Sequence, residues 1–431
     1  TKDRADIVHT ADIIEQYYQR YFGHLSIFVY RYSDYLFRIQ FSIHCSQLDY
    51  KVNRILKKVV ILKSKKIRTI MFLPHHLSKR YTNDNRTALE AQRAAHEISQ
   101  APIVFQVSRL MIKFGILQML SDSRDGLTID EIASKSRLSV YAVKVLLESS
   151  MSIGTVLYDN DKFVCSKTGW FLLNDPSVRV NMDFNHDVNY LGMFHLEEAL
   201  LSGKPAGLSV FGDWSTLYEG LSSLPEKVQK SWFGFDHYYS DGSFADAFKV
   251  VFEDRPKRLL DVGGNTGKWA LYCVGHDSEV EITIMDLPQQ IELMKRNIAS
   301  AAGADRIQGY GCNMLSEDTA FPTGFDVVWF SQFLDCFSET EIVSILKRAA
   351  KALSPNAKIY IMETLWDRQK FETASYVLTQ TSVYFTAMAN GNSKMYHSQD
   401  FINLVEQAGL KVERIYDNIG TGHTILRCRA K

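Results

Sequence analysis

The sequence predicts an α/β protein in which a doubly wound parallel sheet follows a mainly helical domain. Three observations predict this fold class. From about residue 251 onward, apolar runs of strand length alternate with amphipathic helical patterns. A glycine-rich turn follows the first of these runs, and two further strand-like runs close the chain as a hairpin.

The most informative segment is the first predicted strand of the sheet and the turn after it. Residues 259–262 read Leu-Leu-Asp-Val, an apolar run that suits a strand covered on both faces. The turn contains three glycines, which permit positive φ and close approach of a ligand: Gly263, Gly264 and Gly267. The next strand, 280–286, ends in Asp286, roughly twenty residues after the last glycine, where a carboxylate binds ribose hydroxyls. The pair predicts a site for an adenosine-containing cofactor.

The glycine spacing narrows the kind of cofactor. It does not fit the dinucleotide fingerprint G-x-G-x-x-G, and the chain has no G-x-x-x-x-G-K-[ST] phosphate loop. Asp261, two positions before the first glycine, places a carboxylate near the cationic end of the ligand. A carboxylate there suits a sulfonium and an ammonium group better than a phosphate.

The remaining elements of this domain follow in order. Residues 325–330 and 357–362 read as buried strands, and 338–353 and 400–409 as amphipathic helices. The turn-rich segment 417–422 then joins two strand-like runs, 410–416 and 423–428, into a terminal β-hairpin, which departs from the dinucleotide fold.

The preceding domain reads as helical from 88 to 120, with Pro102 expected to mark a break. Thr128 and Glu131 form the signature of a capping box at the start of another helix. A helix at 139–151 and two short strands, 156–158 and 162–165, complete a winged-helix pattern. The helix at 139–151 carries too few basic residues for phosphate contacts, so no nucleic-acid partner is expected.

Several ordered motifs resemble those of the class I S-adenosylmethionine methyltransferases, specifically the caffeate-type small-molecule O-methyltransferases. They are Asp-Val-Gly-Gly-Asn-Thr-Gly at 261–267, Met-Asp-Leu-Pro at 285–288, Cys-Asn-Met-Leu at 312–315 and the segment 333–339. The similarity covers residues 88–431. It implies a Rossmann-like methyltransferase domain with a terminal hairpin, a homodimer formed through the winged-helix domain, and S-adenosylmethionine as cofactor.

The resemblance also assigns cofactor-binding residues. Gly263 would approach the methionine moiety, Asp286 the ribose, and Asn313 with Met314 the adenine. Asn313 stands where the family usually has Asp, and Ser331 where plant members have Lys. The full set is Asp261, Gly263, Gly264, Gly267, Asp286, Leu287, Asn313, Met314 and Ser331.

The reacting end departs from the family. The family's catalytic histidine falls on Asp335, its first acidic partner on Glu363, and its second on Met395. A carboxylate is a poor base unless burial raises its pKa, and the neighbours Phe333 and Phe337 would provide burial. Asp335 as general base beside Glu363, each raising the pKa of the other, is therefore one interpretation.

Other interpretations of the reacting end stay open. The site works mainly by proximity on an acidic acceptor, or Asp335 only caps the helix beginning near Ser338. His397 in a folded-over loop is a further candidate base. Methylation of an activated aromatic carbon, or a cofactor-binding regulator that has lost catalysis, are the alternatives to O-methylation.

The acceptor pocket is expected to be apolar and to suit a flat, small aromatic hydroxyl compound. Residues matching the regions that line the family's acceptor site are Trp232, Phe235, Asp236, Tyr239, Phe333, Tyr384 and Met388.

Composition and charge give the expectations for metal binding, compartment and membrane association. Formal net charge is zero, and the six cysteines are scattered without metal-ligand spacing, which favours reduced thiols, a cytoplasmic protein and no metal. No apolar stretch is long enough to span a bilayer, so no membrane partner is expected.

We expect four regions along the chain. Residues 86–180 form the winged-helix dimerisation domain, 181–250 a helical connector lining the acceptor site, and 251–431 the cofactor-binding catalytic domain. Residues 1–85 are an atypical basic and aromatic extension, in which 51–68 combines basic residues with an apolar stripe. That stripe suits a membrane-surface or nucleic-acid helix. We prefer an accessory or spurious upstream extension, with Met71 nearer the true start.

Overall fold

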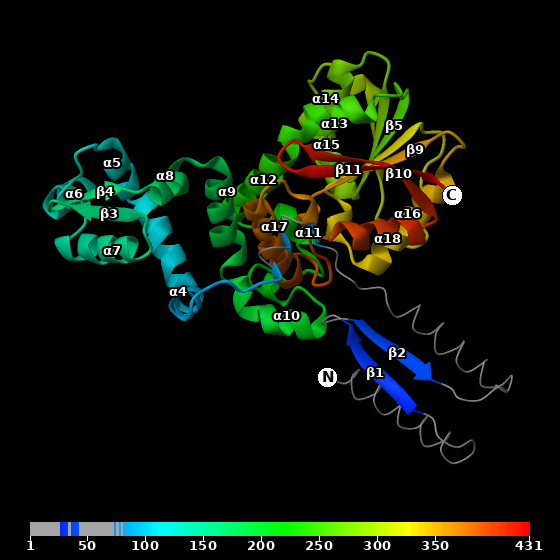
Figure 1. The fold of residues 1–431 in the computed structure, drawn as a ribbon. Helices are drawn as coiled ribbons and strands as arrows, with labels where there is room; N and C mark the ends of the chain where they lie inside the picture. The colour runs from blue at the N-terminus through cyan, green and yellow to red at the C-terminus, as the bar shows by residue number, and fades with distance from the viewer. Residues whose placement is uncertain (1–25, 33–35, 43–72, 75–76, 79–80) are drawn as a thin grey trace. The chain divides into compact units, whose positions relative to one another are not determined.

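The computed structural model describes residues 26–32, 36–42, 73–74, 77–78 and 81–431 (Figure 1). The chain divides into two units, Thr1–Met71 and Phe72–Lys431. In the first unit, β1 (Ser26–Tyr32) and β2 (Leu36–Ser42) form an antiparallel pair that the sequence analysis did not predict. The basic segment 51–68 lies outside the described residues.

The second unit begins with a helical domain and a small hairpin. The predicted capping box is confirmed, because Thr128 accepts the Glu131 amide and the Glu131 carboxylate accepts the Thr128 amide. Leu120, Ile132 and Leu147 form its buried core. Its elements are α4 (Ala88–Lys113), α5 (Ile116–Asp122), α6 (Ile129–Ser136), α7 (Val140–Ser152), β3 (Val156–Asp159) and β4 (Lys162–Cys165).

The expected break at Pro102 is wrong, because α4 continues through the proline. Proline has no backbone N–H, so α4 lacks one hydrogen bond at this position but does not end there; the Pro102 carbonyl accepts the Tyr190 hydroxyl at 3.0 Å. The break comes instead at Gly115, whose φ of 71° ends the helix, and α5 departs at 63°. Among the described residues no single helix is long and apolar enough to cross a membrane; only this bent pair passes that criterion jointly.

The C-terminal part of the chain is built on a seven-stranded sheet in the order β10-β11-β9-β8-β5-β6-β7. Five neighbouring strands, β9, β8, β5, β6 and β7, run parallel to one another. The strand β11 is antiparallel to both of its neighbours, β10 and β9. The strands are β5 (Arg258–Val262), β6 (Glu281–Asp286), β7 (Ile307–Gly311), β8 (Val327–Ser331), β9 (Lys358–Glu363), β10 (Leu410–Ile419) and β11 (His423–Ala430).

All strands predicted for this sheet are confirmed within a few residues, but β7 was missed. It reads Ile-Gln-Gly-Tyr-Gly, and only Ile307 is buried. Glycine is disfavoured in strands, so the run carries no strand pattern. Gly309 is required by packing, since a Cβ there would lie 2.5 Å from Ile291 on α15.

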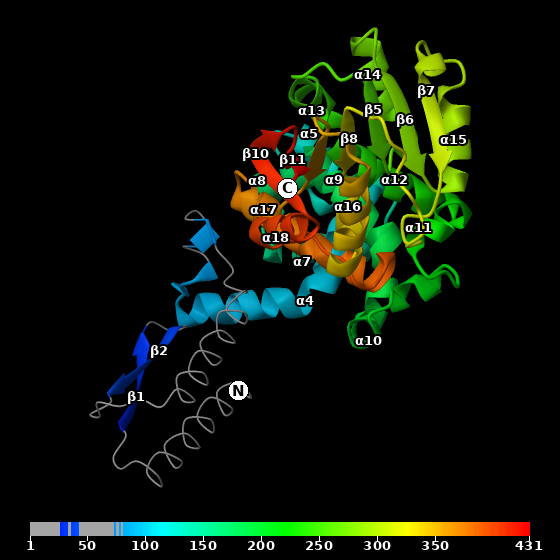
Figure 2. The same ribbon diagram turned by 90° about the vertical axis from the view of Figure 1, so that its right-hand side faces the viewer.

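Helices cover both faces of the sheet, as Figure 2 shows from the side. Leu259 packs in one core cluster with α13 (Phe244–Val251), α14 (Lys268–His276) and α15 (Pro288–Ile298). Leu260 packs in another with α16 (Glu339–Ala352) and α18 (Ser398–Gln407). Successive side chains of a strand point to opposite faces, which is why both are buried.

A third hydrophobic core combines side chains from the helices before β5 with side chains from residues 378–395. Several of its members line the candidate site. Its members include Phe184, Leu217, Val228, Tyr384 and Met388. The elements around it are α8 (Lys167–Asn174), α9 (Pro176–Phe184), α10 (Leu196–Ser202), α11 (Leu217–Gly220), α12 (Glu226–Ser240) and α17 (Glu372–Tyr384).

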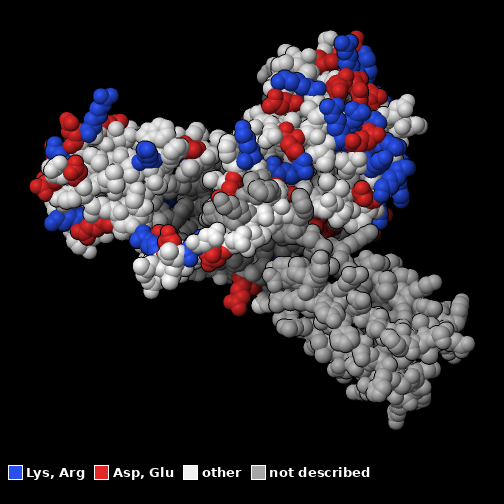
Figure 3. All heavy atoms as spheres, viewed as in Figure 1, with Lys and Arg blue, Asp and Glu red and all other residues white. Residues whose placement is uncertain are grey.

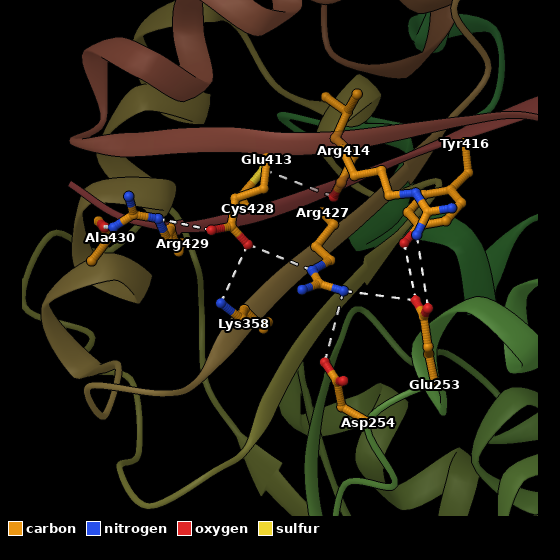
Figure 4. Close-up of polar contacts among 11 residues, drawn as sticks. Glu253, Asp254, Lys358, Glu413, Arg414, Tyr416, Arg427, Cys428, Arg429 and Ala430 are labelled. Carbon is orange, nitrogen blue, oxygen red and sulfur yellow. Dashed lines mark hydrogen bonds and ion pairs between the residues drawn. The ribbon is translucent and has the colours of Figure 1, made fainter.

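Acidic and basic side chains are interspersed over the part of the chain that contains this sheet, on the face shown in Figure 3. On the terminal hairpin they form a network, drawn in Figure 4. Glu413 of β10 lies 3.2 Å from Lys358, 3.5 Å from Arg427 and 2.8 Å from Arg429. Arg427 also pairs with Glu253, which precedes β5. These contacts fasten β10 and β11 to β9 and to the segment after α13.

Candidate active site

The turn after β5 has the geometry that the glycines predict. Gly263 and Gly267 have φ values of 77° and 81°, in the left-handed region. A Cβ on Gly263 would lie 2.2 Å from the Phe333 ring, and one on Gly264 would lie 2.6 Å from Asp261 Oδ2. The turn therefore has no room for side chains at its first two positions.

Asp286 joins this turn to the end of β6. Its Oδ2 accepts the Asn265 amide at 2.9 Å, and its Oδ1 accepts the Leu287 amide at 2.7 Å. Burial raises the pKa of Asp286, and these two backbone bonds partly offset the effect. Each carboxylate oxygen keeps a further lone pair, which suits ribose hydroxyls.

Asp261 is a buried carboxylate without a full set of partners. It is 2% exposed, and its Oδ2 has no hydrogen bond among the described residues. Burial, and then the charge of Asp286, raise the pKa of Asp261 to about 8. An unpaired buried carboxylate is costly, so a cationic ligand group next to it would be stabilising. The residues present thus fit a cofactor with a cationic methionine end.

At the expected adenine end, Asn313 Oδ1 accepts the Leu315 amide at 2.9 Å, which leaves the amide nitrogen of its side chain available. Met314 is 5% exposed and belongs both to the core and to the wall of a cavity.

One cavity of about 960 Å³ connects these residues with the expected acceptor end. Gly267 lies outside its wall. The predicted residues that do line it are Asp261, Gly263, Gly264, Asp286, Leu287, Asn313, Met314, Ser331, Trp232, Phe235, Asp236, Phe333, Asp335 and Tyr384.

The structure places two expected acceptor residues elsewhere. The Tyr239 hydroxyl donates to Asn181 at 3.1 Å, and the side chain lies outside the cavity wall. Met388 is fully buried behind the wall, where a Cβ on Gly192 or Gly207 would meet its sulfur. Both residues lie in the segments that match the family's acceptor site, but neither side chain reaches the cavity.

Asp335 lies in a short 3-10 helix, Leu334–Cys336, and is 7% exposed. The Cys336 thiol donates to its Oδ1 at 3.5 Å, and burial raises the pKa of Asp335 to about 6. The helix-cap alternative is wrong, because Ser338 caps α16 and forms a capping box with Glu341.

Glu363 ends β9 and does not line the cavity. Its Oε1 accepts the amides of Phe333 at 3.2 Å and Leu334 at 2.8 Å. Burial, followed by the charge of Asp335, raises the pKa of Glu363 well above its usual range. Glu363 therefore holds the backbone that carries Asp335 and acts as a positioning residue.

The structure also places Met395 and His397, the two other residues considered for the reacting end. Met395 lines the cavity, with its sulfur 3.3 Å from the Thr364 hydroxyl. His397 is 2% exposed, lies outside the cavity wall and accepts the Gln399 amide as the cap of α18. His397 as a replacement base is thus wrong.

Trp214 and Tyr218 also line the cavity and were not predicted as site residues. Trp214 lies against two glycines, since a Cβ on Gly212 or Gly220 would come within 2.5 Å of its ring. A tryptophan flanked by two glycines was the available signal. No group of His, Cys, Asp or Glu that could hold a metal occurs in the part of the chain that the structure describes.

Comparisons with known proteins agree with this geometry. A Dimerisation2-like domain model matches residues 92–163, and an O-methyltransferase domain model matches 245–411. The chain is 23% identical over 313 residues to L-tyrosine C(3)-methyltransferase of Streptomyces lavendulae, covering 72% of this chain and 84% of the relative. It is 22% identical over 346 residues to demethylspheroidene O-methyltransferase of Rhodobacter capsulatus, covering 78% and 81%.

Among solved structures, an O-methyltransferase from neocarzinostatin biosynthesis, in complex with S-adenosylmethionine and 2-hydroxy-5-methyl naphthoic acid, has a TM-score of 0.57. It is 17% identical, and the match covers 76% of this chain and 96% of that one. The domain models, the sheet and the cofactor turn lead to one conclusion: the chain belongs to the S-adenosylmethionine-dependent methyltransferases that join a Dimerisation2-like domain to an O-methyltransferase domain.

Proposed function

We propose that this methyltransferase transfers a methyl group in line to the hydroxyl of a small aromatic acceptor. The observation that carries the proposal is the single cavity, which has cofactor-binding residues at one end and Asp335 between aromatic walls at the other. When bound, S-adenosylmethionine supplies an electrophilic methyl group on its sulfonium. Asp261, Asp286, Asn313 and Met314 would hold it.

Asp335 accepts the hydroxyl proton. With its pKa at about 6, it is a stronger base than an ordinary aspartate, but a simple phenol has a pKa of about 10. Full proton transfer before methyl transfer would therefore be uphill by about 5 kcal/mol. Alignment of donor and acceptor in an aromatic cavity lowers the activation barrier further, so proximity and proton transfer to Asp335 both contribute to the rate.

Methylation of a ring carbon is the second candidate, and the similarity to a tyrosine C(3)-methyltransferase favours it. Removal of the phenol proton activates the neighbouring ring carbons, so the same base serves either atom. A non-catalytic regulator that binds the cofactor is the third.

The decisive assay uses purified enzyme, S-adenosylmethionine with a ¹³C-labelled methyl group and a panel of phenols and catechols. We expect labelled product, and we expect Asp286→Ala to lower cofactor affinity by about 10- to 100-fold, because two backbone amides and the ribose lose their acceptor. The carbon chemical shift of the product separates O-methylation from C-methylation. Asp246→Asn, which changes a half-exposed carboxylate outside the cavity, is the control. Cofactor binding without transfer to any acceptor would instead support the regulator.

We propose a cytoplasmic homodimer whose interface lies on the winged-helix domain, with the domain limits 86–180, 181–250 and 251–431. Exposed apolar side chains of that domain support it, among them Leu89 and Ile98 on α4, which are 78% and 76% exposed. The five cysteines of the described residues are free, which supports a reducing compartment.

Sedimentation velocity is expected to give twice the monomer mass. Ile98→Glu places a charge on the proposed interface and is expected to shift the protein to monomer, because an unpaired charge is costly there. Ser99→Glu adds the same charge on another face of α4 and should leave the dimer intact. A monomeric wild-type protein at micromolar concentration would contradict the proposal.

A further inference from the structure

The acceptor end of the cavity contains two carboxylates that come from different elements. Asp236 lies on α12 and Asp335 on the loop after β8, and both line the cavity. They are close enough for the charge of Asp335 to contribute to the raised pKa of Asp236, which burial brings to about 6. An apolar pocket for a neutral phenol needs one base and gains nothing from a second carboxylate.

The protein does not neutralise this pair. Asp335 is nine-tenths buried, its Oδ1 accepts the Cys336 thiol, and it forms no ion pair with a cationic side chain among the described residues. Asp236 Oδ2 accepts a neutral amide from Asn265 at 3.4 Å. Lys268 and His237 partly offset the rise in the pKa of Asp236, but both form their ion pairs with Asp241, at 2.8 and 3.4 Å, and not with Asp236. Lys204 also lines the cavity, but its side chain is exposed to solvent.

The cofactor cannot neutralise the pair either. S-adenosylmethionine carries a sulfonium, an ammonium and a carboxylate, which leaves one net positive charge. Asp261, with its unpartnered Oδ2, already lies in the cofactor turn to meet that charge. One net negative charge or more is left over at the acceptor end, where a low dielectric makes it expensive.

The neighbouring walls have the chemistry that binds an organic cation. Trp232 and Tyr384 line the cavity, and the Trp232 indole donates to the Tyr384 hydroxyl at 2.9 Å, which fixes both rings. Phe235 precedes Asp236 and stacks on Phe184 with ring centroids 4.1 Å apart. Aromatic faces next to a carboxylate attract an ammonium group through cation–π and ionic interactions together.

We propose that the acceptor carries a protonated amine in addition to its aromatic hydroxyl, and that Asp236 binds this ammonium while Asp335 faces the hydroxyl. This inference rests on the proposed function and names its substrate class, an aminoalkyl phenol. The ammonium supplies the positive charge that the cavity lacks.

The test measures binding, so it does not depend on turnover. Calorimetry on enzyme saturated with S-adenosylhomocysteine compares two amines with their isosteric hydrocarbons: tyramine with 4-propylphenol, and 2-(aminomethyl)phenol with 2-ethylphenol. The two pairs place the amine at different distances from the hydroxyl. We expect at least one amine to bind tenfold or more tightly than its isostere. Asp236→Asn should abolish that preference and leave the Kd of the hydrocarbon unchanged.

Three outcomes would overturn the proposal. Neither amine is preferred over its isostere; the preference persists in Asp236→Asn; or that variant weakens binding of S-adenosylhomocysteine instead, which would assign Asp236 to the cofactor. Asp246→Asn changes a half-exposed carboxylate outside the cavity and should keep the preference. Thermal unfolding checks that each variant is folded. Methylation of neutral phenols with no amine preference would leave the proposed function standing and this inference refuted.

Discussion

Asp335→Asn is expected to lower kcat by about 10²- to 10⁴-fold while leaving the affinity for S-adenosylmethionine within about twofold. The amide keeps the shape of the side chain but cannot take a proton from the acceptor. In the wild-type enzyme, kcat should rise with pH and level off above about pH 6, because only the ionised carboxylate is a base. The variant should lose this acidic limb.

The same variant should change stability in a pH-dependent way. The folded-state pKa of Asp335 lies above the ordinary value of 3.8, so the unfolded chain gives up this proton first as pH rises. Wild-type stability therefore falls between about pH 4 and pH 6 and stays lower above that range. The free energy of unfolding of Asp335→Asn should exceed that of the wild type by up to about 3 kcal/mol at pH 7. At pH 4 the two should be equal.

Urea unfolding at both pH values measures this effect. Glu339→Gln, on the exposed first turn of α16, is the matched control and should change neither kcat nor stability appreciably. An unaltered kcat in Asp335→Asn would remove Asp335 as the base and leave proximity alone.

Gly263→Ala is expected to weaken cofactor binding by about 30-fold or more. A methyl group there must adopt a φ of 77° and lies 2.2 Å from the Phe333 ring, so the turn or the ring has to move. The left-handed conformation costs about 1–2 kcal/mol and overpacking about 1–3 kcal/mol. Calorimetry with S-adenosylhomocysteine measures the loss.

Gly275→Ala is the control for that variant. Gly275 lies on α14 with nothing within 4 Å of an added Cβ and without a positive φ. Alanine in a helix is better than glycine by about 0.5–1 kcal/mol, so this variant should bind the cofactor normally and unfold at a slightly higher temperature. Equal cofactor affinity in both variants would mean that the turn does not approach the ligand.

The cofactor end could be predicted from the sequence because its signals are local. The apolar run 259–262, the glycines after it and Asp286 at the end of the next strand each follow from neighbouring residues. The capping box of Ser338 and Glu341 is also a local pattern, but it was not predicted, and Asp335 was left open as the cap of α16.

The reacting end could not be predicted in the same way because its geometry is tertiary. The spacing placed Glu363 near Asp335, but nothing local shows that its carboxylate turns to the amides of Phe333 and Leu334. That arrangement depends on Gln332, which has a φ of 47° between β8 and the loop. Likewise β7 is a strand only because β6 pairs with it.

Phe333 gives the site a property that none of its residues has alone. Its ring occupies the space that a side chain at Gly263 would take, and its amide is one of the two that Glu363 holds. The turn at 263–267 and the loop that carries Asp335 are therefore coupled through Phe333, and a displacement of either one shifts the other. Coupling of this kind is reciprocal. A directed-evolution screen that scores only product would confuse damage to donor binding with damage to proton transfer, so the two need separate readouts.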